Sequence, residues 1–182
     1  MRRLVGCLVT LCSAASAALA DLPGVDFDRM PIGCLIYNRY GDGTQWVEYY
    51  AGKSGANHIV RTYARPEQAG QKAQEISIIT YDADGFMVKR VWASGKWEIF
   101  EPFSCFSRPG DSIYTYRNAD GMAKTYKGTV RASGKSLISS GGFVGDDPFN
   151  DTTLRLGPFG NIASFSEGAT RFKVVKYAGC GL

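Results

Sequence analysis

The sequence predicts an all-β fold, an antiparallel up-and-down barrel or sandwich of about ten short strands. The chain of 182 residues contains 3 Trp, 10 Tyr, 10 Phe and 22 Gly, a composition typical of many short strands joined by tight turns. Runs of β-branched and aromatic residues end repeatedly at Asp-Gly dipeptides, which are strong hairpin signals. Gly/Ser/Lys turns follow these dipeptides at a similar distance along the chain.

A signal peptide is expected over residues 1–20. Two arginines precede the apolar run of residues 4–11, and residues 18–20 (Ala-Leu-Ala) form a small-residue cleavage site. The apolar run is shorter than the roughly 20 residues that a membrane-spanning helix needs. We therefore expect a periplasmic or secreted protein with a single β-rich domain over residues 21–182 and no transmembrane segment after cleavage.

The strands group into three repeated β-meanders. The three Asp-Gly turns end at Gly43, Gly85 and Gly121, which lie 42 and 36 residues apart. A second turn that shares Gly, Ser and Lys follows each of them: residues 52–55, 93–96 and 132–135. Each unit therefore reads strand, turn, strand, turn, strand. Three units give nine strands, and residues 170–177 add a last one.

The remaining segments are expected to connect these strands. Residues 66–74 are the only stretch with a helical composition, and we expect them to cross between the first and second meanders. Longer loops are expected at residues 104–111 and 141–151, which are rich in Gly, Pro or Asp.

Three cysteines, Cys34, Cys105 and Cys180, follow the leader, and they allow one disulfide with one thiol left over. In an up-and-down sheet of ten strands, all three lie at the same end of the molecule. If the sheet closes, the first and last strands become neighbours, which favours the pair Cys34 with Cys180. The pair Cys34 with Cys105 remains a close alternative.

Charge and motifs argue against several classes of function. The net charge is +4 for the whole chain and about +2 without the two leader arginines. The Lys and Arg residues are scattered, so we expect no nucleic-acid partner. The Gly-rich residues 140–145 lack the Lys-Ser/Thr ending of a phosphate loop. The acidic residues 146–151 have no calcium-loop spacing, and we expect no metal or cofactor.

Candidate catalytic residues are few, and we do not expect an enzyme. His58 is the sole histidine and lies beside a predicted turn, which indicates a surface or turn residue. Glu98 and Glu101 flank Phe100, and a pair of carboxylates near aromatic walls is typical of a glycosidase cleft. Both fit an ordinary strand pattern, however, in which Glu98 lies on the solvent-facing side.

The leading hypothesis is an exported, non-enzymatic binding protein that uses an aromatic-rich sheet surface or barrel interior. The candidate ligand-binding residues are Trp46, Tyr50, Trp92 and Trp97, because large rings dominate binding energetics. The expected partner is a small apolar ligand or another envelope protein. The alternative is a structural or accessory subunit of a bacterial envelope or surface assembly, joined through the leftover cysteine or a free strand edge.

One short motif resembles a known family. Gly95-Lys96-Trp97 is similar to the G-x-W motif of the lipocalins, small barrels that hold apolar ligands. In lipocalins the motif belongs to the first strand, whereas here it lies past the middle of the chain. The resemblance covers three residues, and we assign no family from it.

Overall fold

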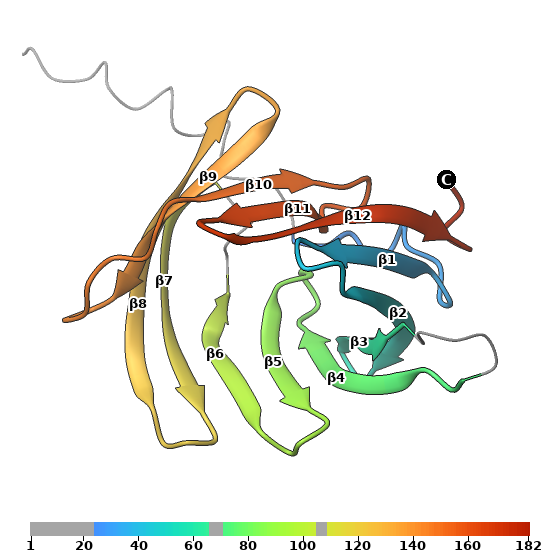
Figure 1. Cartoon of the computed structure of the whole chain (residues 1–182). Coiled ribbons are helices and arrows are strands. Elements are labelled where there is room, and N and C mark those ends of the chain that lie inside the picture. Colours follow the sequence, from blue (N-terminus) through green and yellow to red (C-terminus); the bar gives the residue numbers. More distant parts are fainter. Residues whose placement is uncertain (1–23, 66–70, 105–108) are drawn as a thin grey trace, which may run out of the picture.

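The computed structural model describes residues 24–65, 71–104 and 109–182, which form a closed antiparallel barrel of twelve strands (Figure 1). The strands are β1 Leu35–Tyr40, β2 Gln45–Ser54, β3 Asn57–Ala64, β4 Gln74–Tyr81, β5 Met87–Trp92, β6 Trp97–Ser104, β7 Gly110–Asn118, β8 Ala123–Ser133, β9 Ser136–Phe143, β10 Thr152–Leu156, β11 Ile162–Glu167 and β12 Thr170–Ala178. Each strand pairs with its neighbours in the chain, and β1 pairs with β12 to close the sheet. Within these residues there is no helix that could span a membrane.

The prediction of an antiparallel barrel is confirmed, with twelve strands instead of about ten. The nine strands of the three predicted meanders and the predicted last strand are all present. The two additional strands, β10 and β11, complete a fourth group of three. Residues 66–70 of the expected helix lie outside the described residues. Residues 71–73 are irregular, and Gln74 already begins β4.

The predicted Asp-Gly turns close their hairpins by one recurring arrangement. The backbone N–H of Asp82 donates to the carbonyl of Phe86 (2.9 Å), and Gly85 N–H donates to the carbonyl of Asp82 (3.1 Å). Gly85 has φ 81°, a conformation that favours glycine. The Asp82 carboxylate also accepts from the N–H of Phe86 (2.8 Å). Asn118 takes the place of Asp82 in the β7–β8 turn, so the same local chemistry builds both hairpins.

Because the strands alternate in direction, the barrel has two distinct ends. The cap end holds the start of β1 and the end of β12. It also holds the β2–β3, β4–β5, β8–β9 and β10–β11 turns. At the mouth end lie the β1–β2, β5–β6, β7–β8 and β11–β12 turns, together with the β9–β10 loop. Residues 24–34, which we call the cap segment, precede β1 and lie across part of the cap end.

The cap segment is fastened to two turns by backbone hydrogen bonds. Val25 N–H donates to the carbonyl of Gly85 (2.8 Å), and Asp26 N–H donates to the carbonyl of Phe159 (2.7 Å). The backbones approach so closely that a Cβ on Gly85 would overlap the Val25 backbone. Glycine is therefore required at this contact for space as well as for its φ angle.

Beneath the cap segment lies the largest apolar cluster of the barrel. Phe27 of the cap segment is 5% exposed, and its ring lies 4.8 Å from Tyr50, 4.4 Å from His58 and 5.1 Å from Tyr81. Buried aliphatic side chains of β1, β3 and β4 complete this cluster: Ile36, Val60 and Ile79. The cap segment therefore closes this part of the barrel with side chains of its own.

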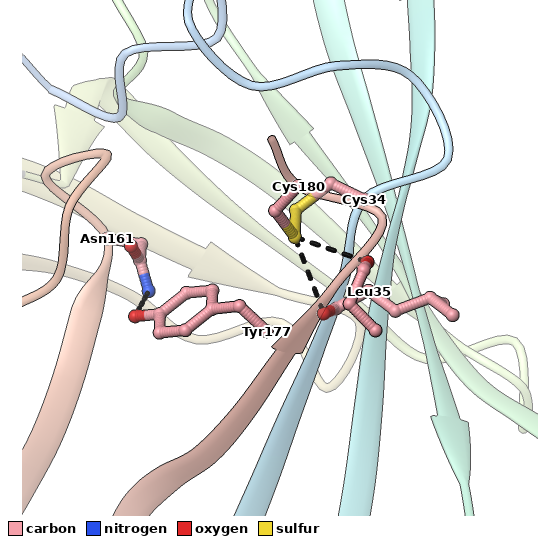
Figure 2. Close-up of a disulfide and its surroundings, with 6 residues drawn as sticks. Cys34, Leu35, Asn161, Tyr177 and Cys180 are labelled. Carbon is pink, nitrogen blue, oxygen red and sulfur yellow. Dashed lines mark hydrogen bonds between the residues drawn. A yellow bond between two sulfur atoms is a disulfide. The ribbon is translucent and has the colours of Figure 1, made fainter. Parts of the chain in front are cut away.

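A disulfide joins Cys34, just before β1, to Cys180, just after β12 (Figure 2), with a Cα–Cα distance of 4.5 Å. The prediction of this pair is confirmed. The prediction assumed that closing the sheet makes the first and last strands neighbours. With any even number of strands, the start of the first and the end of the last then lie at the same end of the barrel. Cys105, the remaining cysteine of the three that follow residue 20, lies outside the described residues.

Candidate binding site in the barrel interior

The strand register decides which side chains face the interior. Glu48 on β2 lies opposite Ile36 on β1 and Thr62 on β3, and both of these partners are buried. Since side chains alternate along a strand, Trp46 and Tyr50 also face inward.

A row of inward-facing rings crosses the mouth end from β11 to β2. The ring of Phe165 stacks on Phe172 with a centroid distance of 5.7 Å, and Phe172 lies 5.4 Å from Tyr40. Tyr40 in turn lies 4.7 Å from Trp46. Burial, reinforced by the Glu48 carboxylate, raises the pKa of Tyr40 to about 12. These rings give four adjacent strands an aromatic inner surface.

A cavity of about 350 Å³ opens inside the barrel beside β8 to β11. Apolar and aromatic side chains dominate its walls: Tyr126, Leu154, Ile162, Phe165 and, from the β9–β10 loop, Phe149. Ser139, Thr152 and Glu167 add polar atoms to the lining. Phe149 is 44% exposed, and its ring lies 6.3 Å from that of Tyr126. The β9–β10 loop thus places an exposed ring beside the cavity at the mouth end.

Two glycines make room for the ring of Tyr126, which is 2% exposed. Gly128 and Gly141 lie opposite each other on β8 and β9. A Cβ on Gly141 would lie 2.6 Å from the Gly128 Cα and would overlap the Tyr126 hydroxyl. Because these two positions lack side chains, they leave room for the Tyr126 ring, which also stacks on Tyr114 at 4.8 Å.

A set of polar side chains faces the interior on β1 to β5, between the cap-end cluster and the aromatic mouth. This polar layer comprises Asn38, Glu48, Thr62, Ser77 and Arg90. Asn38, Thr62 and Ser77 are each 3% exposed, whereas Glu48 and Arg90 are half-buried. Burial raises the pKa of Glu48, and the Arg90 guanidinium and a hydrogen bond from Asn38 oppose that rise.

Three atoms of the polar layer are buried without a hydrogen-bond partner among the described residues: Asn38 Oδ1, Thr62 Oγ1 and Arg90 Nε. Buried polar atoms in folded proteins are nearly always hydrogen-bonded, so each exception needs an explanation. The Arg90 guanidinium also lies 5.0 Å from the centre of the Trp92 ring, a cation–π distance.

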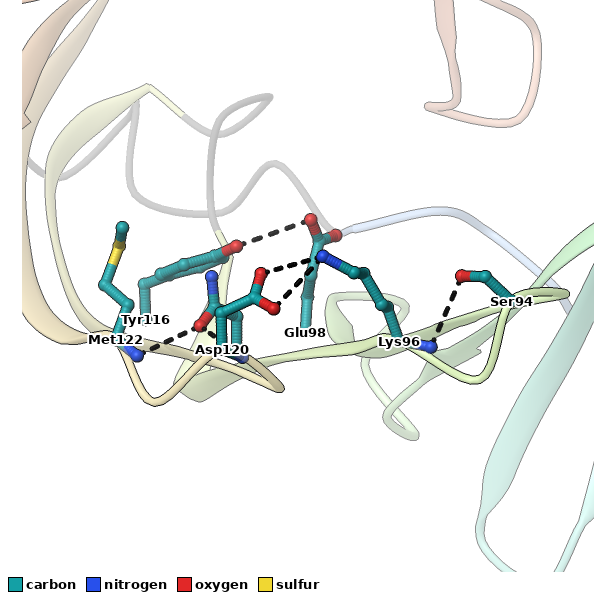
Figure 3. Close-up of polar contacts among 7 residues, drawn as sticks. Ser94, Lys96, Glu98, Tyr116, Asp120 and Met122 are labelled. Atoms are coloured by element: carbon teal, nitrogen blue, oxygen red, sulfur yellow. Dashed lines mark hydrogen bonds and ion pairs between the residues drawn. The ribbon is translucent and has the colours of Figure 1, made fainter.

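Glu98 faces the interior, which corrects the prediction that it lies on the solvent-facing side. It lies opposite Arg90 in the β5–β6 ladder, and its carboxylate accepts a long hydrogen bond from the Tyr116 hydroxyl (3.4 Å) (Figure 3). Glu101 lies three residues further on, and its carboxylate pairs with Arg117 at 3.2 Å on the outer face. The two glutamates therefore point to opposite faces and do not form a catalytic pair with each other.

The four predicted ligand-binding rings lie in three different environments. Trp46 and Trp92 face the interior near the mouth end, and both are half-buried. Tyr50 also faces inward, but it is 4% exposed under the cap segment. Trp97 lies opposite Val91 on the outer face. The structure therefore brings only Trp46 and Trp92 to the accessible part of the interior.

His58 is buried within β3, so its prediction as a surface or turn residue is wrong. It is 3% exposed, its ring stacks on Phe27, and its Nδ1 lies 2.8 Å from the Tyr50 hydroxyl. Burial, with the nearby Lys53 charge, lowers the pKa of His58. It belongs to the cap-end cluster, where Phe27 covers it.

The acidic loop carries no arrangement that suggests a cation site. The Asp146 carboxylate accepts from Lys124 Nζ at 2.8 Å, so a lysine already balances its charge. Among the residues that the structure describes, no group of three or more His, Cys, Asp or Glu side chains is placed to hold a metal ion.

Sequence reasoning missed three interior residues that define the site: Phe149, Phe165 and Arg90. Phe149 was assigned to a loop and Phe165 to a segment without a predicted strand. Arg90 lies in a predicted strand, and a cation at an inward position of a strand is itself a sign of a polar interior. Comparison of the chain with models of protein families, with curated proteins and with solved structures finds no match.

Proposed function

We propose that this chain is an exported, non-enzymatic binding protein that takes a small apolar ligand into the barrel through its mouth end. The observation that carries the proposal is the cavity of about 350 Å³ between β8 and β11, lined mainly by apolar and aromatic side chains. Its size falls within the roughly 300–1,000 Å³ of typical small-molecule sites.

The width of the barrel supports this proposal. A barrel of about eight strands is just wide enough for its own side chains to fill, and the diameter grows with the strand number. Twelve strands therefore allow a wider interior than eight do. The cap segment fills this space near β1 to β4, but it does not line the β8–β11 cavity.

Two features support export to the periplasm or beyond. Residues 1–20, which lie outside the described residues, have the pattern of a signal peptide. The buried disulfide between Cys34 and Cys180 is of the kind that persists in oxidising compartments.

The alternative of an assembly subunit has less support. Every described strand pairs on both sides over part of its length, so only short free edges remain for adding a strand, such as the start of β7, which pairs with β8 alone. Two of the three cysteines that follow residue 20 are already paired. An assembly would therefore depend on Cys105, on a short edge or on a side-chain surface, and a covalent dimer that dissociates on reduction would favour it.

A cavity-filling substitution tests the proposal. Ser139 is 4% exposed and lines the cavity, whereas Ser140 is the next residue of β9 and faces outward. We expect Ser139→Leu to abolish most binding of the fluorescent apolar probe N-phenyl-1-naphthylamine, and Ser140→Leu to leave it unchanged. Native mass spectrometry of the protein from its own host should then show a bound small molecule. Equal probe binding by both variants would refute the site.

A further inference from the structure

We infer that the ligand of the β8–β11 cavity is an amphipathic cation, with an apolar body and an amine or quaternary ammonium group at one end. This inference rests on the proposed function, because it concerns the same cavity, and it names the class of ligand that the cavity prefers. In this site the carboxylate of Glu167, which lines the cavity at the mouth end of β11, binds the cationic end.

The lining of the cavity changes from apolar to polar toward the mouth end. Leu154 on β10 pairs with Phe165 on β11, and both side chains line the cavity. Two residues closer to the mouth end, the same two strands contribute Thr152 and Glu167 to the lining, and Ser139 on β9 lies opposite Thr152. The cavity therefore suits a molecule that buries an apolar body and keeps one polar end near the mouth.

Glu167 carries the only formal charge among the described residues that line this cavity. Its side chain is half-buried, and within the described ranges no lysine or arginine forms an ion pair with it. Lys124, which lies opposite the inward-facing Tyr116, already pairs with Asp146 at 2.8 Å. Beside apolar walls a carboxylate attracts a cation more strongly than it does in bulk water, because the local dielectric constant is lower.

The aromatic rings of the cavity also favour a cation. Phe149 and Phe165 both line it, and an ammonium group is attracted to the face of an aromatic ring. The rim brings Phe149 close to the carboxylate, because a Cβ on Gly168 would lie 3.7 Å from Asn150 Nδ2. The β9–β10 loop and the β11–β12 turn therefore meet at the rim, where they place an exposed ring and an unpaired carboxylate together.

The charge of the whole protein would produce the opposite preference. The chain carries a net charge of +4, or about +2 without the two leader arginines, and a positively charged protein attracts anions non-specifically. A preference for a cationic ligand would therefore come from the lining of the cavity and not from the net charge.

Competition between three molecules of one chain length tests this inference in the whole mature protein. They are decylammonium, decanol and decanoate, which are positive, neutral and negative at neutral pH, and each competes with the uncharged probe N-phenyl-1-naphthylamine. We expect decylammonium to bind most tightly and decanoate least tightly, with a difference of about tenfold between them. Added salt should reduce this difference, because salt screens the carboxylate at the rim.

Glu167→Gln is the decisive variant, because it removes the charge and keeps the shape of the side chain. Affinity for decylammonium should fall about three- to tenfold, the loss expected for one half-buried charged contact. Affinity for decanol and for N-phenyl-1-naphthylamine should stay unchanged, which also shows that the variant is folded. Glu101→Gln is the matched control: it removes an equal charge from the outer face, where Glu101 pairs with Arg117, and it should leave every affinity unchanged.

Two results would overturn the inference. They are decanoate binding at least as tightly as decylammonium, and a decylammonium affinity that Glu167→Gln lowers no more than Glu101→Gln does. If N-phenyl-1-naphthylamine binds and Ser139→Leu abolishes that binding, either result overturns the cationic end alone. If the probe does not bind, or binds equally to Ser139→Leu and Ser140→Leu, the proposed function itself fails.

Discussion

Removing the disulfide should cost the barrel a large part of its stability. Cys34 and Cys180 are 146 residues apart in sequence, so the bridge greatly restricts the unfolded chain. The chain-entropy model gives about 5 kcal/mol for a loop of this length, and measured losses are usually about 2–5 kcal/mol. The β1–β12 ladder remains in the variant. We therefore expect Cys34→Ala/Cys180→Ala to fold, with a free energy of unfolding lower by about 3–5 kcal/mol.

Urea unfolding followed by tryptophan fluorescence measures this loss, with the slope against denaturant checked for a change in the unfolded state. Alanine is the right replacement because Cys34 is 0% and Cys180 4% exposed, and a serine hydroxyl would be buried there. A loss below about 1 kcal/mol in the double variant would refute the argument that this bridge closes the barrel.

Three further predictions concern the cap segment and the polar layer. Phe27→Ala should lower the free energy of unfolding in urea by about 3–5 kcal/mol, because Phe27 packs among three aromatic rings. Gly85→Ala should make the cap segment sensitive to limited proteolysis, whereas Gly43→Ala, at a similar φ but with nothing within 4 Å, should not. The pKa of Glu48 is raised in the folded state, so folding favours the protonated carboxyl. The stability that the protonated Glu48 contributes is fully present below the pKa of the unfolded state and is lost as pH rises through the pKa of the folded state. Glu48→Gln should therefore be more stable than the wild type in urea at neutral pH, with the difference shrinking toward pH 4; a constant difference would contradict this.

The local signals in the sequence were sufficient for most of the strands. Asp-Gly turns and alternating β-branched and aromatic runs act over a few residues, and these signals located the first nine strands. The sequence did not predict β10 and β11, because Thr152–Leu156 is short and Ile162–Glu167 contains Ala and Ser where strand formers are usual. Their pairing with β9 and β12, rather than their own composition, holds them in the sheet.

The direction in which side chains face was harder to predict than the strands themselves. The run of residues 97–100 (Trp-Glu-Ile-Phe) presents a large or charged side chain to each face of the sheet, so alternation alone does not identify the inner face. The pairing of Glu98 with Arg90 across the ladder decides it. His58 was misassigned for a related reason, because the ring that covers it, Phe27, comes from a segment 31 residues earlier with no strand pattern.

The candidate site follows from the mismatch between the width of the barrel and the side chains available to fill it. At the cap end of β1 to β4 the cap segment supplies Phe27 and Met30, and the interior is closed there. Between β8 and β11 the inward positions include Ser139 and Gly141, which are too small to reach across the barrel, and a cavity remains. Filling it by Ser139→Leu should then stabilise the fold while abolishing ligand binding, as expected for a site that function rather than stability keeps open.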